Sequence, residues 1–239
     1  MSALVTGRAL VLVHDPDPAR RAVGVGTVEP ALAALGFDVI VTTLVTGDPV
    51  PDPAEVDVVV VLGAAESAYD DAVPWLAAEL DLVAAAVRAT TPVLGTCFGA
   101  QVLARVLGGE VGRAPRSEHG FVTLGSDDPD LLEPGTWMEF HDDAFTLPPG
   151  ALPLAANEAG LQAFTLGPHL GVQFHPEITP AVFATWAQFW TERGIGDVVA
   201  ASVDLPALQA EIAARAPAAA EACRRLVERF CARAGVLTA

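Results

Sequence analysis

The chain has 239 residues, of which 52% are hydrophobic, and a formal net charge of -17. This composition favours one or one-and-a-half compact domains and excludes a disordered chain. The acidic charge argues against a nucleic-acid partner and against an anionic membrane surface, because both repel it. No apolar run approaches the roughly 20 residues that span a bilayer, and no cleavage-site pattern follows Ala9–Val13, so we expect a cytoplasmic protein.

Short apolar runs alternate with helical patterns in the first half of the chain. The run VDVVVVLG lacks polar alternation, which is typical of a strand covered on both faces. Such alternation predicts a doubly wound, mostly parallel α/β sheet with ligand sites beyond the carboxyl ends of its strands. The predicted strands are Ala9–His14, Phe37–Thr42, Val56–Leu62 and Pro92–Gly95, and the predicted helices are Val28–Leu35, Pro74–Arg88 and Gly99–Leu107.

The second half of the chain has a different pattern. From Phe121 to Phe174, short apolar runs separated by turns such as GSDDPD predict antiparallel hairpins at the sheet edge. A helix over Pro180–Arg193 follows, and then Ala-rich helices over Leu205–Ala216 and Ala218–Ala234. We therefore expect a main domain of residues 1–193 and a C-terminal helical extension, residues 194–239, packed on it.

One of the three cysteines lies between a predicted strand and a predicted helix, in GTCFGAQVLARVLGG. A tight turn through Thr96-Cys97-Phe98-Gly99 would place the Cys97 side chain at the top of the sheet, as in a nucleophile elbow. The positive end of the helix favours the thiolate. A lone cysteine is more often a small core residue, but the glycine-flanked strand–turn–helix context favours a nucleophile. Cys223 and Cys231 are about 12 Å apart along a helix, too far to bridge.

A nucleophilic cysteine needs a base, and His175 in GVQFHPEIT is the best placed of the five histidines. It follows a predicted strand, Gly171–Phe174, and Glu177 is close enough to turn back onto its imidazole. The pattern predicts a Cys-His-Glu triad, although His-Pro-Glu alone would be an ordinary surface turn. His14 and His169 receive no role.

Two interpretations remain open for three further polar residues. His141 and the pair Glu118-His119 either serve an acceptor or a partner interface, or are satisfied polar groups in loops. Cys/His clusters with metal-ligand spacing are absent from the sequence, so it predicts no metal site and no cofactor.

GTCFGAQ with LARVLGG, and GVQFHPE some 70 residues later, resemble the two signatures of class I glutamine amidotransferases. The likeness is greatest to stand-alone proteins similar to the amidotransferase domain of GMP synthetase, and it covers about residues 8–193. It implies that Cys97 attacks the side-chain amide of glutamine, giving a γ-glutamyl thioester and ammonia. It also implies that His175 shuttles the proton and that Glu177 orients His175.

The resemblance assigns further residues as well. It implies that backbone N–H groups of Ala64 and Phe98 hold the oxyanion. Gln101 would line the glutamine pocket, and the segment His141-Asp142-Asp143 would help to hold the amino-acid end of the substrate.

Two stretches depart from the family pattern. Ala64 stands in Gly63-Ala64-Ala65-Glu66-Ser67 where the family usually has Gly-Gly-Pro-x-Ser, so we expect a restricted oxyanion hole if a positive φ is needed there. The stretch Phe140-His141-Asp142-Asp143 replaces a Trp-His-Gly-Asp-like stretch, which bears on substrate detail.

Three functions follow from these residues. The leading one is a glutaminase that supplies ammonia to a partner synthetase, since the chain has no P-loop motif with which to activate an acceptor. The second is a self-sufficient hydrolase of a γ-glutamyl amide or peptide. The third is a catalytically silent binding module, which only the altered Ala64-Ala65 loop favours.

Overall fold

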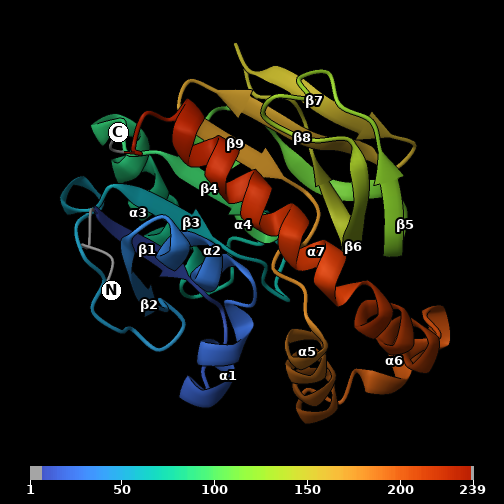
Figure 1. Ribbon diagram of the computed structural model, residues 1–239. Coiled ribbons are helices and arrows are strands. Elements are labelled where there is room, and N and C mark those ends of the chain that lie inside the picture. The colour runs from blue at the N-terminus through green and yellow to red at the C-terminus, as the bar shows by residue number, and fades with distance from the viewer. Residues whose placement is uncertain (1–6, 238–239) are drawn as a thin grey trace.

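The computed structural model describes residues 7–237, and these residues form a seven-stranded sheet, a separate two-stranded sheet and surrounding helices (Figure 1). The order in the large sheet is β2-β1-β3-β4-β9-β8-β7, and the first five of these strands run parallel. Strands β8 and β7 run antiparallel at one edge, which confirms the predicted sheet with its edge hairpin. The strands are β1 (Gly7–Leu12), β2 (Phe37–Thr42), β3 (Val58–Val61), β4 (Val93–Thr96), β7 (Leu152–Asn157), β8 (Gly160–Leu166) and β9 (His169–Val172).

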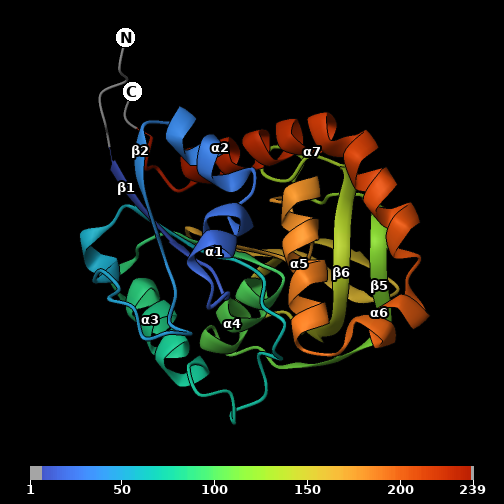
Figure 2. The ribbon, with the colours of Figure 1, turned by 90° about the horizontal axis from the view of Figure 1, so that it is seen from below.

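Helices cover both faces of the large sheet (Figures 1 and 2). Along β1, Ala9 and Val11 pack in one core with α2 and α7, whereas Leu10 and Leu12 pack in the other core with α3 and α4. Both faces of the central strands are therefore dry, which is why β3 reads as four consecutive valines. The helices are α1 (Pro18–Gly24), α2 (Val28–Ala34), α3 (Leu76–Ala89), α4 (Phe98–Val106), α5 (Pro180–Glu192), α6 (Gly196–Ser202), α7 (Leu205–Arg233) and a short 3₁₀ helix at Pro53–Glu55.

The helices α1 and α6 were not predicted. They have seven residues each. Helix α1 is stabilised at its first turn. The Asp17 side chain accepts a hydrogen bond from the Ala19 N–H, and Pro18 follows this cap.

Strands β5 (Val111–Leu124) and β6 (Gly135–Phe145) correct the prediction of edge hairpins that begin at Phe121. They pair only with each other, as a second sheet, and β5 begins ten residues earlier. The charged, proline-containing start of β5 is tolerated because an edge strand need not donate every ladder hydrogen bond. One face of β6 packs against the large sheet, through Trp137 on Phe174 and Phe145 on Phe164.

Helix α7 corrects the prediction of two Ala-rich helices, because it runs unbroken through Pro217. Proline lacks the N–H that would bond the carbonyl four residues earlier, so it weakens the helix there. Packing on either side holds the helix together, since Ile212 and Cys223 are both fully buried. Within the described residues, no helix is both long enough and apolar enough to cross a bilayer.

Phe230→Ala is expected to lower the free energy of unfolding by about 3–5 kcal/mol, because Phe230 of α7 is 2% exposed and shares a core with β1. Val198→Ala in α6, where Val198 is 71% exposed, is the control, with a change below about 0.5 kcal/mol. Urea unfolding measures both. A loss below about 1 kcal/mol for Phe230→Ala would show that α7 is not part of the main core.

Candidate active site

Cys97 occupies a strained turn between β4 and α4. Its backbone has φ 50° and ψ -111°, and among the described residues only Thr90 and Cys97 are non-glycine residues with positive φ. L-residues adopt this region at a cost, and such strain is typical of functional turns. The side chain is 6% exposed and lines a cleft together with His175 and Glu177. The geometry is that of the nucleophile elbow predicted for this position.

Two glycines make this turn possible. A Cβ at Gly95 would lie 2.5 Å from the backbone of Gly99, and a Cβ at Gly99 would overlap the carbonyl of Val61 in β3. The turn is held from the other side as well, because the Cys97 N–H donates to the Val172 carbonyl of β9 over 2.8 Å. The strained backbone is thus enclosed by three neighbouring strands.

The other two cysteines have a different environment. All three are free, and Cys223 and Cys231 do not bridge each other, as their spacing predicted. Burial in α7 raises the pKa of Cys223 and of Cys231 to about 12. Neither therefore supplies a thiolate near neutral pH, which leaves Cys97 as the candidate nucleophile.

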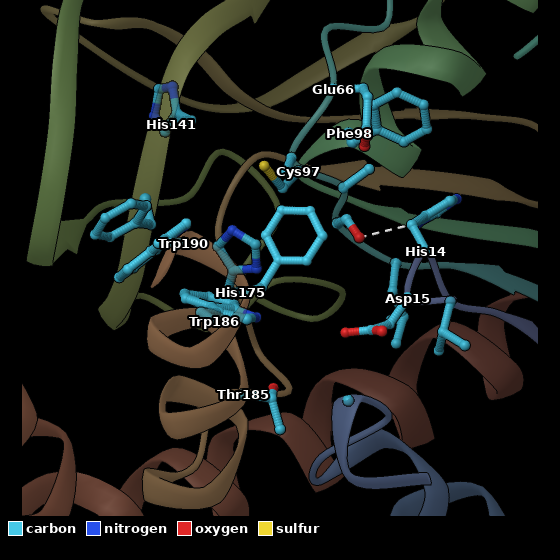
Figure 3. A pocket seen from close by; sticks show the side chains of 18 of the residues that line it. His14, Asp15, Glu66, Cys97, Phe98, His141, His175, Thr185, Trp186 and Trp190 are labelled. Atoms are coloured by element: carbon cyan, nitrogen blue, oxygen red, sulfur yellow. Dashed lines mark hydrogen bonds between the residues drawn. The ribbon is translucent and has the colours of Figure 1, made fainter. Parts of the chain in front are cut away.

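His175 and Glu177 form a buried pair just beyond β9. The Nδ1 of His175 lies 2.6 Å from Oε1 of Glu177, and the backbone N–H of His175 donates to the Met138 carbonyl over 2.8 Å. Burial lowers the pKa of the imidazole, but the charges of Glu177 and Cys97 and hydrogen bonds with them outweigh burial and raise the His175 pKa well above its ordinary value. The site therefore favours an imidazolium beside the sulfur (Figure 3).

The loop that carries Glu177 is fixed by the connection between α1 and α2. The Thr27 N–H donates to the Glu177 carbonyl over 3.2 Å, and the Thr27 hydroxyl donates to the Pro176 carbonyl over 2.9 Å. At Gly26, where φ is +55°, any Cβ would overlap the Glu177 carbonyl. The carboxylate is therefore held toward His175 by contacts far away in sequence.

The loop after β3 lies against the same two side chains. A Cβ at Gly63 would lie 2.7 Å from Cε1 of His175 and 3.7 Å from Cβ of Cys97, so this position requires glycine. The next residue, Ala64, lines the cleft with Phe98, as the predicted oxyanion hole requires. Ala64 is not in the left-handed region, so its Cβ adds no backbone strain in this conformation.

The predicted substrate residues also line the cleft. Gln101 is buried, with its Nε2 3.4 Å from both the Asp143 carbonyl and Oε1 of Gln173. His141 and Asp143 are buried on one face of β6, whereas Asp142 is exposed on the other face. A residue that the sequence left without a role, Ser67, donates its hydroxyl to Asp143 over 2.6 Å and joins the loop after β3 to β6.

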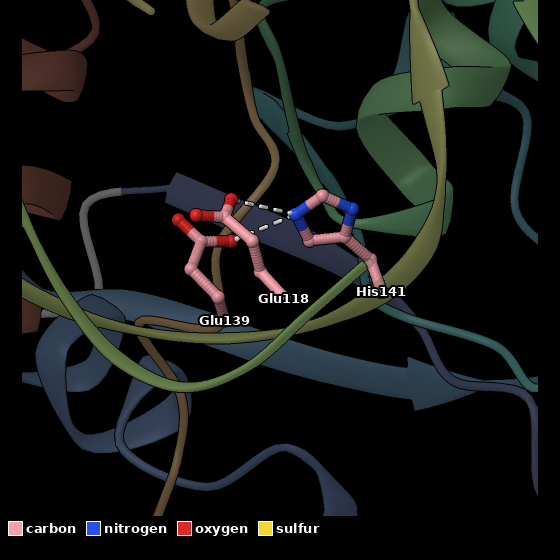
Figure 4. Close-up of side chains that lie close together, drawn as sticks. All are labelled: Glu118, Glu139 and His141. Atoms are coloured by element: carbon pink, nitrogen blue, oxygen red, sulfur yellow. Dashed lines mark hydrogen bonds and ion pairs between the residues drawn. The ribbon is translucent and has the colours of Figure 1, made fainter. Parts of the chain in front are cut away.

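His141 belongs to a buried cluster with Glu118 and Glu139 (Figure 4). Its Nε2 lies 3.3 Å from Glu118 and 3.4 Å from Glu139, and its Nδ1 lies 2.9 Å from the Asp143 carbonyl. The ligand atoms of the three side chains lie within 4.8 Å of one another, and they are of kinds that bind divalent metals. The expectation that Glu118 and His141 lie in loops was wrong, because they face each other across β5 and β6.

Glu139 was missed by sequence reasoning, which gave no sign that a carboxylate is buried in β6. It is 0% exposed, and neither of its oxygens receives a hydrogen bond. Burial and the neighbouring charge of Glu118 raise the Glu139 pKa well above its ordinary value, although His175 lowers it. Burial also lowers the pKa of His141.

The cleft extends beyond Cys97, His175 and Glu177. It encloses about 350 Å³, and one wall is aromatic. Trp186 of α5 stands edge-on to His175, with ring centroids 4.7 Å apart, and Phe140 stacks on Trp190 (Figure 3). The sequence predicted a helix at α5 but not this wall, since the contact of α5 with β6 is not a local feature.

A cysteine at a helix N-terminus beside a His-Glu pair is the arrangement of enzymes that transfer acyl groups through a thioester. The whole fold resembles solved glutamine amidotransferases. One from Thermotoga maritima is 24% identical with a TM-score of 0.81, covering 94% of this chain and 98% of that one. One from Methylobacillus flagellatus is 25% identical with a TM-score of 0.77, covering 96% of this chain and 95% of that one.

The family model for class I glutamine amidotransferases matches residues 27–189, and the chain belongs to this family. The GMP synthase (glutamine-hydrolysing) of a Synechococcus species is 37% identical over 134 residues, which are 52% of this chain and 24% of that protein. One subunit of the glutamine-hydrolysing GMP synthase of Ignicoccus hospitalis is 40% identical over 101 residues, which are 38% of this chain and 54% of that subunit. The matches thus span a quarter to about half of the length of these relatives.

Glu139→Gln is expected to flatten the dependence of stability on pH. The folded-state pKa of Glu139 is raised, so between the ordinary value and the raised one the folded chain binds more protons than the unfolded chain. Stability contributed by protonated Glu139 is therefore lost as pH rises through that window. Unfolding free energies at about pH 5 and about pH 8 should differ less in the variant.

Glu158→Gln, at an exposed position, is the matched control, because it removes the same charge outside the cluster. It should show the same pH dependence as the unsubstituted protein. An equally unchanged pH dependence in Glu139→Gln would mean that Glu139 is not buried as described.

Proposed function

We propose that this chain hydrolyses the side-chain amide of glutamine, with Cys97 as the nucleophile, and supplies the ammonia to a separate synthase. The observation that carries the proposal is the strained backbone of Cys97 in the same cleft as the buried His175–Glu177 pair. The family match supports the substrate.

In the first half-reaction the Cys97 thiolate attacks the amide carbon, and the imidazolium of His175 protonates the leaving nitrogen. Ammonia departs and a γ-glutamyl thioester remains. In the second, His175 takes a proton from water, the resulting hydroxide attacks the thioester, and glutamate leaves as the thiolate reforms. Glu177, 2.6 Å from Nδ1, keeps the ring oriented and stabilises its positive charge.

The tetrahedral intermediates carry a negative oxygen, for which we propose the N–H groups of Ala64 and Phe98. Both residues line the cleft beside Cys97, and Phe98 begins α4, whose positive end favours an anion. Gln101, His141, Asp142 and Asp143 are proposed to hold the rest of the substrate.

A partner is proposed because the sequence carries no P-loop motif with which to activate an acceptor. The relative from Ignicoccus hospitalis is one subunit of a synthase, which supports supply of ammonia to a second chain. Residues 1–193 are proposed as the amidotransferase domain and residues 194–239 as an extension packed on it. The likeness to solved structures reaches beyond residue 193, because it covers 94% and 96% of the chain.

A second candidate is a self-sufficient hydrolase of a γ-glutamyl amide with an apolar leaving group. The aromatic wall of Trp186, Trp190 and Phe189 favours it, because departing ammonia needs no such surface. A silent binding module is disfavoured, since the strained cysteine and the buried His175–Glu177 pair are both kept.

Cys97→Ala is expected to reduce ammonia release from glutamine by about 10⁴-fold or more, because no other thiol reaches the amide. Cys231→Ala is the matched control, since Cys231 is buried in α7 outside the cleft. A coupled glutamate dehydrogenase assay measures both. Turnover that survives in Cys97→Ala would remove the nucleophile from the proposal.

The two candidate functions give opposite substrate preferences. The leading proposal predicts a higher kcat/KM for glutamine than for a γ-glutamyl anilide, whose aromatic leaving group must occupy the wall. A preference for the anilide by about tenfold or more, about 1.4 kcal/mol in barrier, would instead favour the hydrolase. In that case Trp186→Ala would lower kcat/KM for the anilide more than for glutamine.

A further inference from the structure

His14 is a buried histidine at the carboxyl end of β1 that the proposed mechanism does not use. Its Nδ1 lies 2.9 Å from the carbonyl oxygen of Gly63, and its Nε2 lies 2.9 Å from Oε2 of Glu79 in α3. The side chains of His14 and Glu79 are each 1% exposed. A buried ion pair of this kind is costly unless its geometry is well satisfied, so its position beside the active-site loop calls for a reason.

The hydrogen bond to Gly63 decides which way the next N–H points. A trans peptide is planar, and its C=O and N–H point in opposite directions. The described residues contain no cis peptide bond. Because the Gly63 oxygen faces His14, the N–H of Ala64 faces away from His14. The side chains of Cys97 and His175 lie on the cleft side of Gly63.

His14 also contacts the second proposed donor of the oxyanion hole. Its ring packs edge-on against Phe98 and is stacked on Trp75, with ring centroids 5.0 Å apart in both cases. Phe98 supplies the other N–H. One imidazole therefore contacts the carbonyl of Gly63, which precedes the first proposed donor, and the side chain of Phe98, whose N–H is the second.

We propose that His14, anchored by Glu79, is a positioning residue that holds the Gly63–Ala64 peptide with its N–H directed into the oxyanion hole. The inference rests on the proposed function, because it assigns a purpose to that N–H in amide hydrolysis. It also gives a reason why Ala64 can replace a more flexible glycine: the peptide is held from behind and need not rotate when substrate binds.

The charge state of the pair fits this role. A carbonyl and a carboxylate both accept hydrogen bonds, so both ring nitrogens of His14 donate and the ring is an imidazolium. Burial lowers the His14 pKa, but the charge of Glu79 and the hydrogen bonds to Glu79 and Gly63 outweigh it and raise the pKa above its ordinary value. The more distant charge of Glu66 acts in the same direction.

Substitution of His14 by either of two amide side chains distinguishes between its two contacts. The side-chain nitrogen of asparagine overlays Nδ1 of histidine and keeps a donor for Gly63, whereas that of glutamine overlays Nε2 and keeps only the contact with residue 79. Each is tested together with Glu79→Gln, so that no unpaired carboxylate stays buried. Glu79→Gln alone is the background control.

Compared with Glu79→Gln alone, His14→Gln with Glu79→Gln should lower kcat for glutamine by about 10²-fold, with KM changed less than about threefold. This is the order of loss for one oxyanion-hole donor. His14→Asn with Glu79→Gln should keep kcat within about fivefold of the background. Equal losses of kcat in the two double variants would overturn the proposal, because they would reduce His14 to a packing role.

Crystal structures give a readout that needs no substrate. The Gly63 carbonyl should face residue 14 in the unsubstituted protein and in the asparagine variant, and should rotate in the glutamine variant. A Gly63 carbonyl that faces Cys97 in the unsubstituted protein overturns the proposal even if neither variant folds. Rotation in the variant, combined with an unsubstituted protein that releases no ammonia, would instead sustain the role of His14 and remove glutamine hydrolysis.

Discussion

The backbone of Cys97 is the constraint on which the rest of the site depends. A non-glycine residue at φ 50° is stable only where its surroundings leave it no alternative. Here β4 is central in the sheet, Gly95 and Gly99 let the turn pack closely against itself and against β3, and the Val172 carbonyl of β9 accepts the Cys97 N–H. The large sheet, buried on both faces, thus holds the sulfur in the cleft, so its valine-rich strands contribute to the geometry of the site.

Two buried His-Glu pairs lie on either side of the loop at Gly63. His175–Glu177 faces the sulfur, and His14–Glu79 faces the back of the loop. Each pair places an imidazolium where water is excluded, so its field is weakly screened and fixed before substrate arrives. On this view the two histidines have separate roles, because the first moves protons and the second keeps a backbone dipole pointing at the charge that develops.

The sequence predicted those features that depend on residues close together in the chain. Strand β2 and the start of α2 were predicted to the residue, and Cys97 was singled out as a candidate nucleophile because strand, turn and helix signals surround it within a few positions. Contacts between distant segments left no such signal: Glu139 looks like any strand carboxylate, and Trp186 like any core aromatic. His14 had one usable sign, its position after β1, at the sheet edge where Gly63 and Cys97 also lie. Pro217 misled because proline usually ends a helix, whereas burial on both sides of it outweighed that rule.

The packing of α7 against β1 bears on how the protein is made. Residues 223–231 cover the same sheet face as Ala9 and Val11, which leave the ribosome more than 200 residues earlier. Until α7 has been synthesised, one side of the central strands stays open to water and to chaperones. The sheet that strains Cys97 is therefore incompletely covered during translation, so we expect the Cys97 turn to reach its final geometry only after α7 has docked.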